Sequence, residues 1–128
     1  MRRHLAVVLA VALAITACRT APILTPRVTL PSSPTRTDAD VANAIKSAGL
    51  RYGWEMVEDA PDHIKGTLRP RKHVAVVSIP YDANSYSIEY QESVGLRYGN
   101  GEIHHNYNRW VNNLSAEIQN QLGLAKRP

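Results

Sequence analysis

The spacing of apolar residues changes twice along this chain, and this change limits the folds open to it. Between residues 41 and 48 the apolar side chains follow the spacing of one helix face. From residue 54 to residue 90 they alternate with polar ones, as on strands with one buried face. From residue 103 the helical spacing returns. The chain therefore predicts a helix, several strands and a second helix, in that order.

The alternating region divides into four strand candidates. Their inward-facing positions are Trp54 and Met56; Ile64, Gly66 and Leu68; Ala75, Val77, Ile79 and Tyr81; and Tyr86, Ile88 and Tyr90. The three joints, at residues 59–62, 69–72 and 82–85, are short and rich in Pro, Asp and Asn, which is typical of turns. Joints this short connect only antiparallel neighbours. A four-stranded antiparallel meander is the simplest topology.

Two amphipathic helices are available to cover one face of that sheet. The first is expected to begin at Thr37, where Asp40 completes a loose capping box, and to stop at Gly49. The second carries seven large apolar residues in one stripe: Ile103, Tyr107, Trp110, Val111, Leu114, Ile118 and Leu122. The predicted fold class is α+β, a two-layer α-β-β-β-β-α domain over residues 37–122 with a tail at 123–128.

The first residues predict an export signal. Arg2 and Arg3 precede an unbroken apolar run of eleven residues, Leu5–Ile15, which ends in Thr16 and Ala17. Positive charge, a short apolar segment and small residues at the cut site are the three parts of a signal peptide. The run is too short to span a hydrocarbon core about 30 Å thick. Residues 1–17 are therefore predicted to be removed.

The residues Ile15 to Cys18 resemble a bacterial lipobox. That resemblance implies a diacylglycerol thioether and an N-acyl group on Cys18, and hence labelling by palmitate and a membrane anchor facing the periplasm. Cys18 is the only cysteine, so no disulfide can form within the chain. Since Arg19 stands where an aspartate marks inner-membrane retention in enterobacterial lipoproteins, the resemblance favours the outer membrane over the inner membrane.

Residues 18–36 are rich in Pro, Thr and Ser and are expected to form an extended tether between lipid and domain. Removing Arg2 and Arg3 from the 15 basic residues leaves 13 against 11 acidic ones, a net charge of +2. The one tight basic group, Arg69, Arg71 and Lys72, has the pattern of a turn. This balance does not favour a nucleic-acid partner.

Part of the chain resembles a known group of proteins. Ser87–Tyr90 reads SIEY, Ser93, Leu96 and Tyr98 follow, and residues 103–114 read IHHNYNRWVNNL. This pattern is similar to small proteobacterial lipoproteins that end in a helix of the form I-H-x-N-Y-N-x-W-V-x-N-L. The likeness covers roughly residues 53–118 together with the lipobox. It implies a lipoprotein with this fold and transfers no activity, because the group has none assigned.

Asn106, Arg109 and Asn113 are the candidate partner-binding residues. Asn106 and Asn113 lie two helical turns apart on one flank of the apolar stripe, and Arg109 lies further round on that side. The three side chains suit a recognition edge. They equally suit a solvated flank that hydrogen-bonds a neighbouring strand or loop.

The candidate residues for chemistry are few. His63, His73 and His104 could assemble a site from the sheet and the last helix, but no cysteine or spaced carboxylate accompanies them, so no metal or other cofactor is predicted. Ser78, Ser87 and Ser93 lack the G-x-S-x-G context of an exposed nucleophile. The chain is therefore not expected to be an enzyme.

These observations favour a lipid-anchored, non-enzymatic cell-envelope module that binds an unidentified envelope protein or glycan. The alternative is a small envelope enzyme or a metal or ligand carrier that uses His63, His73 and His104. A structural spacer is a third possibility. Because a four-stranded sheet leaves two edges unpaired, a homodimer joined strand to strand is also possible.

Overall fold

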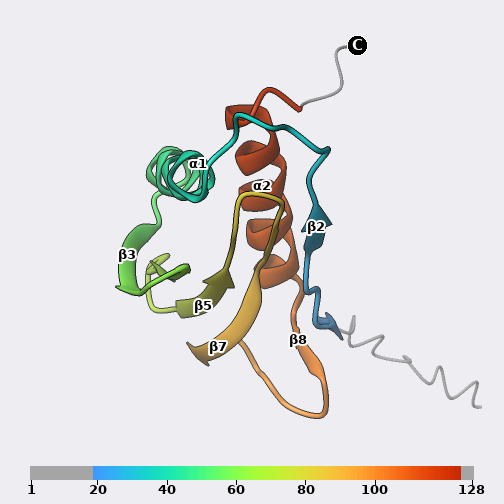
Figure 1. Ribbon diagram of the computed structural model, residues 1–128. Coiled ribbons are helices and arrows are strands. Elements are labelled where there is room, and N and C mark those ends of the chain that lie inside the picture. The colour runs from blue at the N-terminus through green and yellow to red at the C-terminus, as the bar shows by residue number, and fades with distance from the viewer. Residues whose placement is uncertain (1–18, 125–128) are drawn as a thin grey trace, which may run out of the picture.

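The computed structural model describes residues 19–124 and confirms the α+β class (Figure 1). Its helices are α1 (Asp38–Arg51) and α2 (His105–Gln121). Its strands are β1 (Thr20–Pro22), β2 (Arg27–Thr29), β3 (Glu55–Ala60), β4 (His63–Leu68), β5 (Val74–Pro80), β6 (Ser85–Ser87), β7 (Glu89–Val94) and β8 (Glu102–His104). The predicted signal peptide, Cys18 and residues 125–128 lie outside the described residues.

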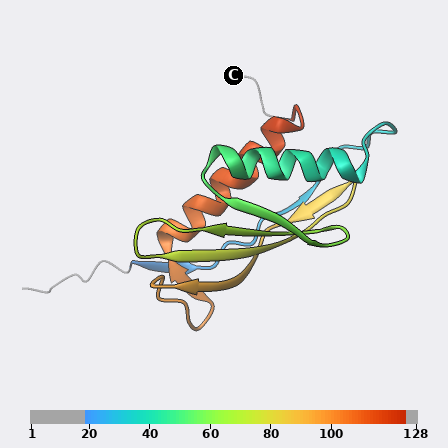
Figure 2. The same ribbon diagram turned by 90° about the vertical axis from the view of Figure 1, so that its left-hand side faces the viewer.

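The main sheet is the predicted antiparallel meander, with strand order β3-β4-β5-β7. Both helices lie on one face of it (Figure 2). The core between these layers includes Ile45 of α1, Ile64 and Val77 of the sheet, and Tyr107 and Leu114 of α2, all fully buried. Alternation on the strands and helical spacing on α1 and α2 thus select the buried side chains, as predicted.

The start of α1 is as predicted, but its end is not. Thr37 caps the helix, and Thr37 and Asp40 form a full capping box. The predicted stop at Gly49 is wrong: the helix runs to Arg51, and the left-handed residue that follows it is Gly53, with φ +81°. Gly49 lies inside the helix, and its lack of a side chain leaves room for Met56 of β3.

The fourth strand of the sheet lies further along the chain than predicted. Tyr86 and Ser87, expected in the main sheet, form β6 with Ser85 and pair with β2 instead. The chain bends at Ile88, whose N–H donates to the carbonyl of Pro26 at 2.9 Å, and β7 then pairs with β5. β6 leaves the main sheet because the amino-terminal segment supplies it with a partner strand, β2. The pattern of residues 54–90 does not reveal this strand.

The prediction of a tether over residues 18–36 is wrong for most of that segment. β1 pairs with β8, β2 pairs with β6, and Leu30 is only 4% exposed. Ile23 and Val28 pack against the core. The prolines permit this arrangement because they fall at strand ends or between strands, where a missing N–H donor breaks no ladder bond. The folded domain therefore begins at residue 20.

The last helix begins two residues after the first residue of its apolar stripe and ends one residue before the last, Leu122. Ile103 belongs to β8, and α2 begins at His105 with His104 as its N-cap residue. Tyr107, Val111, Leu114 and Ile118 of the stripe are nevertheless fully buried. Within residues 19–124, neither helix is long and apolar enough to cross a membrane.

Candidate functional site

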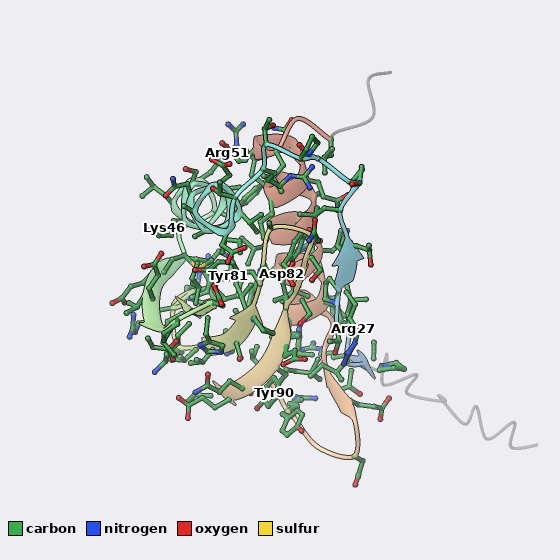
Figure 3. The ribbon with its side chains drawn as sticks, viewed as in Figure 1. Arg27, Lys46, Arg51, Tyr81, Asp82 and Tyr90 are labelled. Carbon is green, nitrogen blue, oxygen red and sulfur yellow. The ribbon has the colours of Figure 1, made fainter. Side chains whose placement is uncertain are left out.

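An open groove of about 450 Å³ lies where β5 ends beside the β2–β6 pair. Tyr81 and Asp82, at the end of β5, lie in the middle of the molecule in Figure 3, and Arg27 lies on β2. The lining of the groove mixes polar and apolar surface and combines carboxylates, hydroxyls, a guanidinium group and aromatic rings. The lining residues are Arg27, Val28, Thr29, Asp62, Pro80, Tyr81, Asp82, Ser85, Tyr86 and Ser87.

Backbone hydrogen bonds hold the groove in shape. The N–H of Tyr81 donates to the carbonyl of Asp62 at 3.1 Å, which joins the end of β5 to the β3–β4 turn. Asp82 Oδ1 accepts from the N–H of Asn84 at 2.7 Å and from the hydroxyl of Ser85 at 3.2 Å. This is the Asx turn that the Asp-Ala-Asn-Ser sequence favours. Part of the groove's lining is therefore a locked turn, one held by its own hydrogen bonds.

The groove is suited to a hydroxyl-rich ligand. Asp62 and Asp82 offer carboxylate oxygens as acceptors, and Arg27 offers donors. Burial, together with the nearby charges of Glu58 and Asp62, raises the pKa of Tyr81, so its hydroxyl stays protonated and can donate. The Tyr81 ring adds an apolar surface beside these groups. Together they can bind a polar ligand that also has apolar faces.

Three side chains that the sequence analysis did not connect meet on the open face of the sheet. His63 of β4 hydrogen-bonds through Nδ1 to Asp59 of β3 and through Nε2 to Ser78 of β5. The bond to His63 lowers the pKa of Asp59. The order carboxylate, imidazole and hydroxyl is that of a nucleophilic triad.

The surroundings of Ser78 do not complete such a triad. Ser78 lies in a central strand and pairs with Lys65 on one side and Glu89 on the other. Its backbone N–H therefore belongs to the sheet ladder and is not available to stabilise an oxyanion. The arrangement links three strands across the sheet, and cross-strand pairing of this kind is a structural role.

The other two candidate histidines lie on different elements from this network. His73 ends the β4–β5 turn and His104 caps α2. Burial lowers the pKa of His104, and the neighbouring positive groups, first His105 and then Arg19, lower it further. Among residues 19–124, no group of three or more His, Asp, Glu or Cys side chains is placed to hold a metal ion.

The predicted recognition edge lies on α2, but the side chain that makes contacts there is a different asparagine. Asn106 and Asn113 are half-buried and Arg109 is exposed. Asn108, which the sequence analysis passed over, accepts from the N–H of Leu24 at 2.8 Å and donates to the carbonyl of Pro22 at 2.9 Å. Asn108 therefore joins α2 to a neighbouring segment, and the roles of Asn106, Arg109 and Asn113 stay a prediction.

The network of Asp59, His63 and Ser78 depends on the register of β3, β4 and β5, which alternation alone does not fix. The groove was missed for a different reason. The turn at residues 82–85 was predicted, but no local signal indicated that β2 would pair beside it.

Comparison of the chain with protein-family models, with curated proteins and with solved structures finds no significant match. The resemblance to a lipoprotein group therefore stays a prediction.

Proposed function

We propose that this chain is a lipid-anchored cell-envelope protein that binds a glycan, without catalysis, in the groove beside β2, β5 and β6. The observation that carries the proposal is the groove itself, with two carboxylates, a guanidinium group and a partly exposed tyrosine around a locked turn. Sugars present hydroxyls for such acceptors and donors, and apolar ring faces for an aromatic side chain.

The anchor is part of the proposal. The lipobox at residues 15–18 supports acylation of Cys18, and two or more acyl chains give durable attachment to a membrane. Arg19 favours the outer membrane, with the domain facing the periplasm. Radioactive palmitate labelling tests the anchor: the parent chain should take up label and the Cys18→Ser chain should not.

Binding is tested by titrating the mature protein with soluble peptidoglycan fragments and with core oligosaccharide, followed by NMR of backbone amides. Shifts should gather at Arg27, Tyr81 and Asp82. The double variant Asp62→Asn with Asp82→Asn should bind at least tenfold more weakly. Asparagine keeps the Asx turn at residue 82 and tolerates the positive φ of residue 62, so the fold should survive.

The matched control is Asn106→Ala with Asn113→Ala, which leaves the groove intact. Glycan binding that survives in the Asp double variant and is lost in the control would place the site on α2 and overturn the groove. A lack of binding to either glycan, with a protein captured instead through the α2 flank, would favour a protein partner.

The alternative, a small envelope enzyme, rests on Asp59, His63 and Ser78 instead of on His63, His73 and His104. A fluorophosphonate probe, which labels activated serines, distinguishes the two proposals. A binding module should remain unlabelled. Labelling of Ser78 that disappears in His63→Ala would establish a serine nucleophile and displace the binding proposal.

A further inference from the structure

The chain enters the fold at one end of the molecule. The carbonyl of Arg19 accepts from the N–H of His105 at 2.9 Å and bonds His105 Nδ1 at 3.0 Å. Thr20 then pairs with His104 in the β1–β8 ladder. Consecutive Cα atoms are about 3.8 Å apart. A lipid on residue 18 would therefore be attached within one residue of Arg19, which already bonds the folded domain.

Two other segments lie at the same end. The N–H of His104 donates to the carbonyl of Leu96 at 2.8 Å, which places the β7–β8 loop beside β8. The β4–β5 turn joins this loop because Val74 pairs with Val94 and the His73 ring lies against Gly95. In Figure 2, blue β1 and the orange loop before β8 share one end of the molecule.

This end is basic. Residues 19–22, 69–73 and 95–105 contain five Lys or Arg side chains, three histidines and a single acidic residue, Glu102. Arg69 pairs with Glu55 at 2.8 Å. The remaining lysine and arginines are Arg19, Arg71, Lys72 and Arg97, and all four are exposed. The basic turn at residues 69–73 thus lies at the same end of the molecule as the entering chain.

The opposite end is acidic. Residues 37–40, 59–62 and 81–85 contain five aspartates and no Lys or Arg. They lie together because Tyr81 bonds the turn at Asp62, while Arg36, the basic residue that borders them, bonds the carbonyl of Ala83 at 3.3 Å. The molecule therefore has a charge gradient along its length, with the positive pole where the chain enters.

An aromatic side chain completes the basic end. Tyr98 is 53% exposed in the β7–β8 loop, and its ring stacks on Tyr90 with centroids 4.0 Å apart. Tyrosine is favoured at the headgroup level of membranes, because its ring is apolar and its hydroxyl is polar. Basic side chains beside an anionic lipid surface add to its attraction, each by roughly fivefold in affinity.

We propose that the surface formed by Arg19, Arg71, Lys72, Arg97 and Tyr98 lies against the anionic headgroups of the bilayer that holds the lipid anchor. The inference rests on the proposed acylation of Cys18. It gives the domain a fixed orientation: the acidic end and its groove point away from the membrane, toward ligands in the periplasm.

The experiment uses the acylated protein in phosphatidylcholine vesicles with and without phosphatidylglycerol. Since Cys18 carries the lipid, an introduced cysteine is the one free thiol for a fluorophore. Gly99→Cys, at an exposed position beside Tyr98 where a Cβ meets no other atom, reports on the proposed surface, and Ala39→Cys, in the first turn of α1, reports on the opposite end. Spin-labelled headgroups should quench the label at 99 severalfold more than the label at 39, and salt should weaken this difference.

Charge variants complete the test in the Gly99→Cys background. Arg97→Asn with Lys72→Gln should reduce quenching at residue 99; asparagine tolerates the positive φ of residue 97. Lys46→Gln, on α1, should not (Figure 3). Equal quenching at residues 99 and 39 in protein that floats with the vesicles would overturn the orientation alone. Protein that neither floats nor takes up palmitate would overturn the anchor and the orientation together.

Discussion

The side chain of Asn108 accepts a hydrogen bond from the backbone N–H of Leu24 at 2.8 Å, across 84 residues of sequence. Its amide nitrogen also donates to the carbonyl of Pro22 at 2.9 Å. One side chain on α2 thus replaces the ladder bonds that the segment between β1 and β2 lacks. This contact joins the amino-terminal segment to the domain and sets where a lipid anchor would meet it.

Replacing Asn108 by alanine should lower the free energy of unfolding by about 1–2 kcal/mol, because two net hydrogen bonds are lost. Hydrogen exchange should also accelerate at residues 20–29. Urea denaturation of the mature protein measures the first effect. Asn112→Ala, an exposed position on the same helix, is the control and should stay within about 0.5 kcal/mol. An Asn108→Ala chain as stable as the parent would show that the two hydrogen bonds of Asn108 do not stabilise the fold.

Two buried tyrosines should respond in opposite directions to loss of the hydroxyl. The hydroxyl of Tyr107 is buried and has no partner among the described residues, and burial strongly raises its pKa. Tyr107→Phe should therefore leave stability unchanged or raise it by up to about 1 kcal/mol. The hydroxyl of Tyr86 bonds the carbonyl and the hydroxyl of Ser115 at 3.0 and 2.8 Å.

Tyr86→Phe should therefore cost about 1–1.5 kcal/mol, since it removes both hydrogen bonds to Ser115. Thermal and urea unfolding of the two variants, measured side by side, check the pair. A larger loss from Tyr107→Phe than from Tyr86→Phe would show that the Tyr107 hydroxyl has a partner in solution.

His104 should make stability depend on pH. Its pKa in the folded protein lies below the ordinary value of 6.5, so the unfolded chain binds more protons between these two pKa values. Stability is then highest above pH 6.5 and falls as the pH drops through that interval. His104→Asn keeps an N-cap acceptor but does not titrate.

Unfolding midpoints measured for the His104→Asn variant should decline less than those of the parent between pH 8 and the lowered pKa of His104. His105→Gln removes the neighbouring histidine, whose charge is the smaller cause of the shift, and should retain most of the decline. Parallel pH profiles of the parent and His104→Asn would argue against His104 as the responsible group.

Gly49→Ala should destabilise the protein although alanine is the better helix former. A Cβ at residue 49 would clash with Cγ of Met56, so the side chain of Met56 must move. Overpacking of this kind costs about 1–3 kcal/mol, which exceeds the gain in helix propensity of about 1 kcal/mol. Denaturant melts of Gly49→Ala in the parent and in Met56→Ala should show a smaller penalty in the latter.

The sequence by itself determined the elements whose signals are local. The capping box at Thr37 and Asp40, the alternation of Ile64, Gly66 and Leu68, and the stripe through Tyr107 and Leu114 each depend on residues a few positions apart. Their physical cause, a cap bond or one buried face, is written within a single element. The α+β class and the meander followed from them.

Only the tertiary structure decided which distant segments meet. β1 and β2 find partners more than 50 residues away, and Asn108 bonds a loop 84 residues from it. The groove at Tyr81 and the basic end at Arg19 both arise from those pairings. A strand of three residues has no periodicity of its own to read; it forms because edges of the folded domain offer it hydrogen bonds and apolar surface.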